Sequence, residues 1–237
     1  MSNIPSVETL MKAGVHFGHQ KSKWHPKMKP FIYIEKNGVH IINLEQTQKL
    51  LEKALGFIEK TVQNNGTVLF LGTKRQAQGL VKEAALSCDM PYVVTRWLGG
   101  TLTNATSVLG LAKKYRKLKE DKASGKLDKF TKKEKLTVTR EIERLEDIVG
   151  GISKLERIPN VIFVVDVKHE KTAVQEAIRK GVPVVAICDS NVNPDKIDYP
   201  IPGNDDATKA IELFVKLVAD KINEAKQADT TKNTKNK

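Results

Sequence analysis

Four short segments of the chain are almost continuously apolar and rich in β-branched residues. They are TVLFL (67–71), PYVVT (91–95), NVIFVVD (160–166) and VPVVAICD (182–189). Strands that are covered on both faces have this composition, so the pattern predicts a parallel sheet lying between helices. A fifth segment, YPIP (199–202), predicts an edge strand, because proline cannot donate a hydrogen bond within a central strand.

Segments of helical character separate these strands, at 74–87, 170–181 and 205–226. Gly181 stands where the second of these helices would end, and glycine is common at that position. Asp205 opens the third segment, where an acidic residue favours a helix N-terminus. The alternation of strand and helix with short connections predicts a doubly wound α/β fold.

Residues 101–158 interrupt this alternation. Their apolar positions recur at spacings of three and four, which predicts two helices that share a hydrophobic seam. The seam positions are Val108, Leu111, Tyr115 and Leu118 in one helix and Val138, Ile142, Leu145, Val149, Ile152 and Leu155 in the other. Gly125 lies between the helices, and Thr131 and Glu134 have the spacing of a capping box. We therefore predict an antiparallel coiled-coil hairpin that projects from the body of the protein.

This insertion sets the expected domain organisation. Residues 1–103 and 159–226 form one α/β globular domain, and 104–158 form the inserted hairpin. The last segment, QADTTKNTKNK (227–237), has no apolar periodicity and predicts a disordered tail.

The charge of the chain is concentrated in part of its length. The formal net charge is +12, and residues 101–158 alone contain 15 lysines and arginines against nine acidic residues. Residues 159–223 are slightly acidic, with eight basic and ten acidic side chains. This asymmetry favours a basic arm that lies on a polyanion. A merely solvated charged face remains the alternative.

Composition excludes several other classes. No apolar run approaches the ~18 residues of a membrane span, and the N-terminus lacks the pattern of a secretory signal. The two cysteines, Cys88 and Cys188, stand 100 positions apart in apolar segments. Buried free thiols in a reducing cytosol are the expectation, so we expect a cytoplasmic protein.

The segment HFGHQKSKWHPKMKPF (16–31) combines histidines, lysines and a tryptophan. A zinc site usually takes four ligands, and no cysteine lies near His16, His19 and His25. Structural histidines are a second interpretation. The third is contact with RNA, because lysines pair with phosphates while aromatic faces such as Trp24 stack on unpaired bases. We favour the third and expect no metal.

Two turn motifs have both structural and binding interpretations. GTKRQ (72–76) follows a strand and opens a helix, without the glycine pattern of a nucleotide-binding loop. Lys74 and Arg75 are expected to reach a phosphate from outside it. RWLGGTLTN (96–104) offers Arg96 and several hydroxyl and amide donors beside a glycine turn. It fits a sharp turn into the hairpin or a contact with an RNA backbone equally well.

Asp166, Asp189 and Asp205 come just after apolar strands or just before a helix. In a parallel sheet they are expected to meet at the carboxyl edge, where doubly wound enzymes place their sites. Caps and turns are the commoner role of such residues. HEKTA (169–173) lacks the second histidine of HExxH, and no GxSxG occurs. The sequence therefore predicts no enzyme, with a nucleotide- or phosphosugar-dependent α/β enzyme as the alternative.

Several separate motifs resemble one known family. They are HFGHQKSKWHPKMKPFIYIEKNGVHIINLEQT, LFLGTKRQAQ, TRWLGGTLTN, IPNVIFVVDVKHEKTAVQEA and GVPVVAICDSNVNPDKIDYPIPGNDDA. In this order, and with the hairpin in the same place, they resemble the bacterial small-subunit ribosomal protein S-two family over roughly residues 1–226. One departure is His25, where the family often carries asparagine, and this argues against a metal ligand there.

The resemblance implies a three-layer αβα sandwich with a flavodoxin-like parallel sheet and a protruding coiled coil. It implies a non-catalytic constituent of the small ribosomal subunit, without a cofactor. Its expected partners are small-subunit ribosomal RNA and other ribosomal proteins, including the large RNA-binding protein S-one, which helps capture messenger RNA. The expected RNA-binding residues are His19, Lys21, Lys23, Trp24, His25, Lys27, Lys29, Lys74, Arg75, Arg96, Thr103, Asn104, Lys113, Lys114, Arg116 and Lys117.

Overall fold

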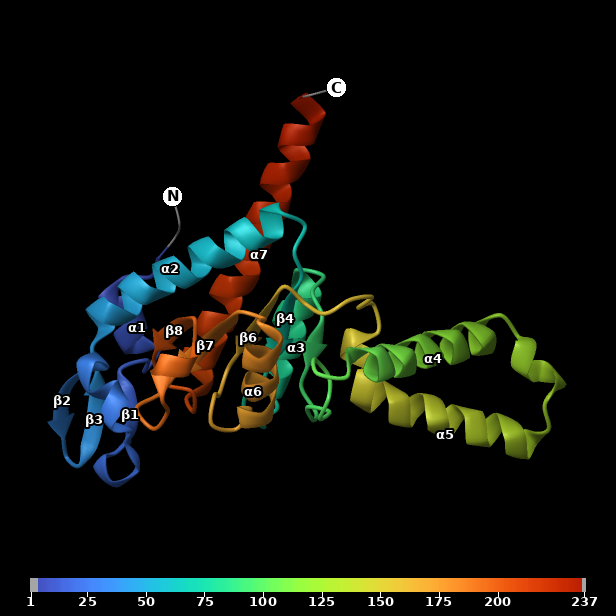
Figure 1. Ribbon diagram of the computed structural model, residues 1–237, viewed down its shortest axis with the longest axis horizontal. Coiled ribbons are helices and arrows are strands. Elements are labelled where there is room, and N and C mark those ends of the chain that lie inside the picture. The colour runs from blue at the N-terminus through green and yellow to red at the C-terminus, as the bar shows by residue number, and fades with distance from the viewer. Residues whose placement is uncertain (1–3, 236–237) are drawn as a thin grey trace.

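A five-stranded parallel sheet forms the centre of the molecule. The structure, a computed structural model, describes residues 4–235, apart from the side chains at 128 and 229–235. The strands are β4 (Val68–Leu71), β5 (Tyr92–Val93), β6 (Val161–Val164), β7 (Val184–Cys188) and β8 (Tyr199–Pro202). Their spatial order is β5-β4-β6-β7-β8, and each pair is parallel (Figure 1). The predicted parallel sheet and its proline-rich edge strand are confirmed.

Helices cover both faces of this sheet. They are α1 (Val7–Lys12), α2 (Leu44–Gln63), α3 (Gln78–Ser87), α6 (Lys171–Lys180) and α7 (Thr208–Lys235). One core lies between the sheet and α2, α3 and α7, and the other lies under α6 and the root of the inserted hairpin. The predicted three-layer αβα sandwich is therefore confirmed.

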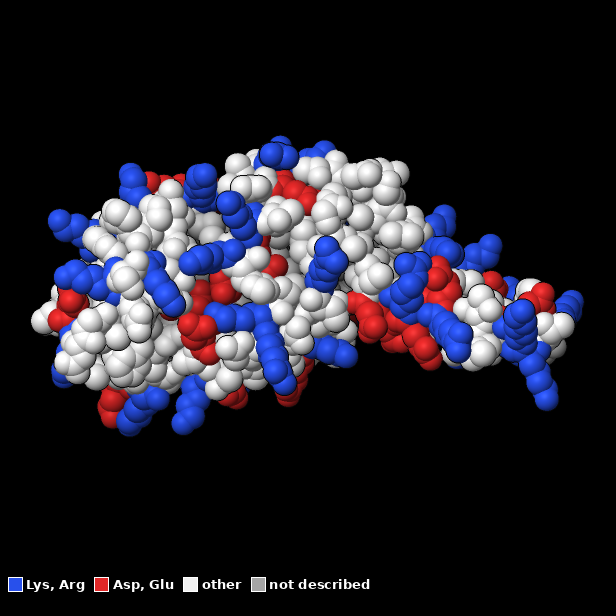
Figure 2. Space-filling model, turned by 90° about the horizontal axis from the view of Figure 1, so that it is seen from below, with Lys and Arg blue, Asp and Glu red and all other residues white. Residues whose placement is uncertain are grey.

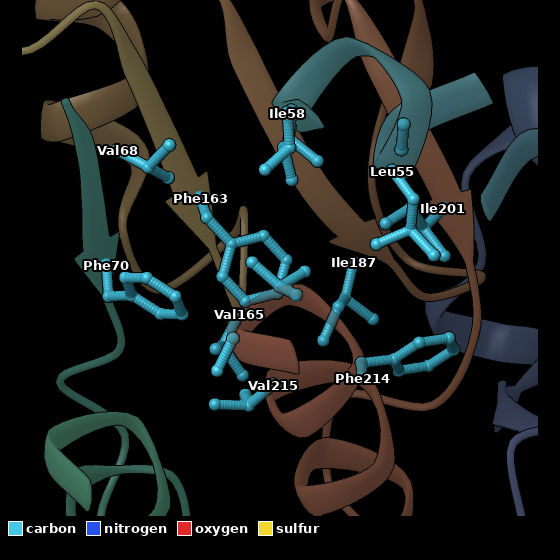
Figure 3. Packing of buried hydrophobic residues seen from close by; sticks show 14 of the residues in the cluster. Leu55, Ile58, Val68, Phe70, Phe163, Val165, Ile187, Ile201, Phe214 and Val215 are labelled. Carbon is cyan, nitrogen blue, oxygen red and sulfur yellow. The ribbon is translucent and has the colours of Figure 1, made fainter. Parts of the chain in front are cut away.

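Successive strand residues supply the two cores in turn, because side chains alternate across a strand. In the first core, Phe70 and Phe163 pack edge to face with their ring centroids 5.6 Å apart. Figure 3 shows them beside Ile58 of α2, with Phe214 of α7 below. Leu69 belongs to the second core. Burial on both faces explains why these strands are apolar throughout.

Helix α2 was not among the helices predicted from the sequence, although the sequence contains the usual signals of a helix there. The side chain of Asn43 caps it by accepting a hydrogen bond from the backbone N–H of Glu45 at 3.0 Å. Leu51, Leu55 and Ile58 are buried at helical spacing. The apolar stripe alone would have located this helix.

A second, antiparallel sheet was also not foreseen. It consists of β1 (Phe17–Gln20), β2 (Ile32–Lys36) and β3 (Val39–Ile42), in the order β1-β3-β2. It lies at the end of the molecule away from the hairpin (Figure 1). Short 3₁₀ turns at Lys21–Lys23 and Pro26–Phe31 join β1 to β2.

The inserted segment forms two helices that run back along each other, α4 (Ala105–Ala123) and α5 (Lys132–Val149) (Figure 1). Thr131 and Glu134 form the predicted capping box. Leu111 is 37% exposed, whereas Ala112 is fully buried. The predicted seam was wrong at Leu111, because the buried stripe of α4 passes through Ala112 instead. Coiled-coil packing along the whole hairpin stays a prediction.

The C-terminal helix is longer than the sequence suggests. Helix α7 continues to Lys235, through most of the segment expected to be disordered, and residues 236–237 lie outside the described part of the chain. Among the side chains of this helix that the structure describes, the last buried one is Ala225. The predicted tail, 227–237, therefore begins just beyond this residue. The structure differs from the prediction of disorder because helix α7 continues through this segment as far as Lys235.

The cysteines and the helices also bear on the compositional predictions. Cys88 and Cys188 are buried free thiols, as predicted. Between residues 4 and 235, no helix is both long and apolar enough to cross a membrane.

Candidate nucleic-acid interface

The lysines of the opening segment lie on the surface, but two of them already have acidic partners. Lys21 pairs with Glu35 at 2.8 Å, and Lys27 pairs with Asp195 at 2.9 Å. Lys23 and Lys29 are exposed as well. Since the paired side chains are themselves largely exposed, these ion pairs are weak and an RNA phosphate would compete with them.

His19 points into the protein and not toward solvent. Its Nδ1 lies 3.0 Å from Asp189 Oδ1, and its Nε2 lies 3.4 Å from Asp206 Oδ2. Its backbone N–H donates to Asp189 Oδ1 and to the Ser190 hydroxyl. The hydrogen bond with Asp189 raises the pKa of His19 above its ordinary value, although burial acts against this. His19 therefore anchors β1 to the carboxyl end of β7.

Trp24 and His25 are half-buried. The Trp24 ring is tilted against the ring of buried His40, with centroids 5.1 Å apart. The backbone N–H of His25 donates to the Ser190 carbonyl at 2.8 Å, and its Nδ1 accepts from Lys27 N–H at 3.2 Å. Both rings hold the segment in place while leaving part of their surface to a partner.

Asp166, Asp189 and Asp205 meet at the carboxyl edge of the parallel sheet, as the topology predicts. Lys74 lies beside two of them and beside Asp206. Its Nζ is 3.0 Å from Asp166 Oδ2, 3.0 Å from Asp205 Oδ1 and 2.6 Å from Asp206 Oδ1. Burial opposes the charge of Lys74, but these carboxylates outweigh it and raise the pKa of its ammonium group. The ammonium group of Lys74 therefore faces inward and is held by carboxylates. This arrangement does not favour the predicted contact of Lys74 with a phosphate outside the protein.

Asp205 is the most constrained of these acids. It is 1% exposed, and its Oδ2 has no hydrogen-bond partner among the residues that the structure describes. Burial, and then the charges of Asp166 and Asp189, raise the pKa of Asp205 to about 7. The cluster thus holds more negative charge than one ammonium group neutralises.

One group of side chains in the described chain is close enough to hold a metal ion. His19, Asp205 and Asp206 offer ligand atoms within 4.8 Å of one another. An imidazole nitrogen and carboxylate oxygens suit a divalent cation such as Zn²⁺. A cation there would compete with the ammonium group of Lys74 for Asp205 and Asp206.

The RWLGGTLTN turn encloses a carboxylate of its own protein. Glu176 of α6 is buried, and it accepts hydrogen bonds from the backbone N–H groups of Gly100, Leu102 and Thr103 at 2.8 to 3.1 Å. The Thr103 hydroxyl donates to the same carboxylate at 3.1 Å. Thr103 is therefore occupied internally, which supports the structural interpretation of this motif.

Arg96 and Asn104 flank this turn and are exposed. Arg75 is exposed at the start of the segment that leads to α3. These three side chains remain accessible to a partner, in contrast to Lys74 and Thr103.

The predicted basic residues of the hairpin differ in their surroundings. Lys113 and Lys117 are exposed one turn apart on α4, whereas Arg116 is half-buried. Lys114 lies 2.8 Å from Glu141 of α5. Figure 2 shows basic side chains projecting along the hairpin, with acidic ones gathered toward its root. The hairpin therefore presents its positive charge away from the body.

Glu176 and Asp206 make internal contacts that the sequence did not reveal. Glu176 stands between the buried residues Val174 and Ala177. A charged residue on an apolar helix face signals a buried partner. The role of Asp206 has no comparable signal, because its contacts with Lys74 and His19 join distant parts of the chain.

Comparison with known proteins identifies the family of the chain. The model of the family described as Ribosomal protein S2 matches residues 10–225. The small ribosomal subunit protein uS2 of Psychromonas ingrahamii is 49% identical over 229 residues, covering 97% of this chain and 93% of that protein. The protein of the same name from Shewanella loihica is 51% identical over 214 residues, covering 90% and 88%.

Relatives of this similarity place the chain in the class of ribosomal proteins, and its basic α/β domain with a projecting helical arm is consistent with that class. The chain belongs to the ribosomal protein S2 family.

Proposed function

We propose that this protein is a structural constituent of the small ribosomal subunit in the cytoplasm, that it binds small-subunit ribosomal RNA, and that it helps dock ribosomal protein S-one. The observation that supports RNA binding most is the projecting hairpin with its exposed cations Lys113 and Lys117. Such cations release counterions when they reach phosphates.

The contact surface is expected to have two parts. The first is the hairpin, and the second is the opening segment with its exposed lysines and the accessible faces of Trp24 and His25. Arg75, Arg96 and Asn104 are exposed as well and are expected to add to it. Lys74, His19 and Thr103 support this surface from within, through the contacts described above.

The enzyme alternative has less support. Its site would be the edge formed by Asp166, Asp189 and Asp205, where Lys74 already neutralises part of the charge. Among residues 4–235, no serine or cysteine side chain donates a hydrogen bond to a histidine ring, so no activated nucleophile of that kind is assembled.

A sucrose gradient of native lysate tests the proposal. At moderate salt the chain is expected to sediment with the small subunit, at about one copy per subunit. Subunits from cells depleted of the chain are expected to lose protein S-one while keeping their other proteins. A chain that stays at the top of the gradient in mild salt would refute ribosomal association, and unchanged S-one content would refute the docking role alone.

A further inference from the structure

An open groove lies along helix α6, on the side of the sheet opposite to α2 and α7. Its volume is about 1150 Å³, and its walls are α6, the turn after it, and the loop 191–198. The floor is aliphatic and contains Val167, Val174, Ile178, Val182, Val192 and Ile197. Ile178 is 47% exposed, so a large apolar side chain stands open to solvent in the groove.

The rim of this groove is positively charged. Lys168, Lys171, Arg179 and Lys196 line it and are all exposed. None of the four forms an ion pair with a residue of the described chain.

The acidic side chains of the groove are already engaged. Asp195 pairs with Lys27 at 2.9 Å, and Asp198 accepts a hydrogen bond from the backbone N–H of Val184 at 2.9 Å. Asp198 keeps its charge, because its partner is neutral, but the four cations of the rim outnumber it and leave the groove with a net positive charge.

We propose that this groove binds an acidic peptide segment of another protein, with a large apolar side chain of that segment seated against Ile178. Carboxylates on either side of the anchor would pair with the rim cations, which is the complementarity that gives such docking its specificity. The groove adjoins the proposed RNA surface at His25, but its floor and its cationic rim lie outside that surface, and the proposal does not depend on the proposed function.

The chemistry of the floor favours a peptide over RNA. Unpaired bases bind to proteins by stacking on aromatic rings or guanidinium planes. The floor offers aliphatic side chains instead, and His25 at its edge is the sole aromatic ring of the lining. Aliphatic pockets accept apolar side chains, as in other peptide-binding grooves.

Fluorescence anisotropy with the full chain tests this. The probe is a short fluorescein-labelled peptide in which glutamates surround a central Leu-Phe-Leu. The matched probes carry an Ala-Ala-Ala centre, or lysines in place of the glutamates. A labelled oligouridine of similar charge represents RNA.

The key variants are Arg179→Glu, Ile178→Ala and Lys180→Glu. Lys180 is an exposed neighbour on α6 that does not line the groove, so Lys180→Glu is the matched charge control. Reversing Arg179 is expected to weaken binding of the Leu-Phe-Leu peptide by about tenfold, and Ile178→Ala by a similar factor. Lys180→Glu is expected to change it less than twofold. All three positions are exposed, and thermal unfolding checks that the variants are folded.

Three outcomes would overturn the proposal. The first is equal affinity for the Leu-Phe-Leu and Ala-Ala-Ala peptides, which would leave the apolar floor without a role. The second is equal weakening by Arg179→Glu and Lys180→Glu, which would indicate bulk charge alone. The third is tighter binding of oligouridine than of the peptide with the same sensitivity to Arg179→Glu, which would assign the groove to RNA.

Discussion

The indole Nε1 of Trp97 donates a hydrogen bond to Oε1 of Glu176, 3.1 Å away and shielded from solvent. Trp97 precedes the hairpin, and Glu176 lies in α6. Three backbone N–H groups of the intervening turn donate to the same carboxylate. One buried side chain thus fixes the root of the hairpin to the globular domain.

Replacing Glu176 with glutamine is expected to destabilise the protein by about 2–4 kcal/mol. The carboxylate would lose its charge, and the new amide NH₂ group would face donors and not acceptors. Urea unfolding at pH 7, followed by circular dichroism, measures the change. Gln175→Glu, at the neighbouring exposed position, serves as control. A loss below about 0.5 kcal/mol for Glu176→Gln would contradict the role of Glu176 in fixing the hairpin root to the globular domain.

The contribution of Glu176 is expected to depend on pH in the acid range. Burial disfavours its charge, but the hydrogen bonds from Gly100, Thr103 and Leu102 outweigh burial and hold the pKa of Glu176 below its ordinary value. A carboxyl group with a lowered folded-state pKa stabilises the protein above its unfolded pKa of about 4.3, and this is lost as the pH falls through the folded-state pKa. The difference between wild type and Glu176→Gln should therefore shrink below about pH 4. Urea midpoints at a series of pH values test this, and an undiminished difference at the lowest pH would count against it.

Replacing Lys74 with methionine is expected to destabilise the protein by about 3–5 kcal/mol, because it leaves buried carboxylates uncompensated. The loss should be greater at pH 8 than at pH 6. The pKa of Asp205 is already about 7, and without the ammonium group ionisation of Asp205 would cost more still. A raised folded-state pKa means that stability falls as the pH rises through it. Arg75→Met, at the exposed neighbouring position, is the control. Equal losses of stability in the two variants would refute the role of Lys74 in compensating the buried carboxylates.

Replacing Trp24 with alanine is expected to lower both stability and ribosome binding. Its ring packs against buried His40, so its removal should cost about 1–2 kcal/mol and lower the melting temperature by about 3–6 °C. The accessible part of the ring is expected to stack on RNA, worth about 1–3 kcal/mol. Trp24→Phe should retain most of the stability and most of the RNA binding, because it keeps an aromatic ring at this position. Calorimetry and binding to subunits separate them, and an unchanged melting temperature would mean that the ring has no structural role.

The exposed lysines of the hairpin are expected to set the salt dependence of RNA binding. Replacing Lys113 and Lys117 with glutamine should reduce the slope of log affinity against log salt by about one unit for each phosphate that the variant no longer neutralises. Lys114→Gln should change it less, because Lys114 is paired with Glu141. Filter binding to small-subunit RNA over a range of salt concentrations measures the slopes. Equal slopes for wild type and the double variant would contradict an arm that lies on RNA.

The sequence predicted the parallel sheet well, because strands buried on both faces carry an unmistakable apolar composition. The segment 160–166 contains β6, and YPIP coincides with the edge strand β8. The segment 91–95 was too long, since β5 covers Tyr92–Val93 and the Thr95 hydroxyl donates to the Asp147 carbonyl at the hairpin root. A side-chain contact of this kind ends a strand without any signal in its apolar pattern.

The antiparallel sheet escaped prediction for a physical reason. Tyr33 is 73% exposed and Ile34 is 54% exposed, so β2 lacks the alternation of buried and exposed positions that identifies a half-buried strand. The candidate site was predictable in part. Parallel topology brings Asp166 and Asp189 to one edge, but the contacts of Lys74 and His19 with that edge depend on tertiary packing between segments far apart in sequence.

The anchoring of β1 has a consequence for the order of folding during synthesis. The backbone N–H of His19 donates to Asp189 and Ser190, which lie 170 and 171 positions later, and the N–H of Asn204 donates to the Val15 carbonyl. At roughly 5–20 residues per second, a translating ribosome makes these partners about ten to thirty seconds after the N-terminal segment. The earliest part of the chain is therefore expected to settle last, and until then Leu10 and Val15, which are fully buried in the folded protein, are available to chaperones.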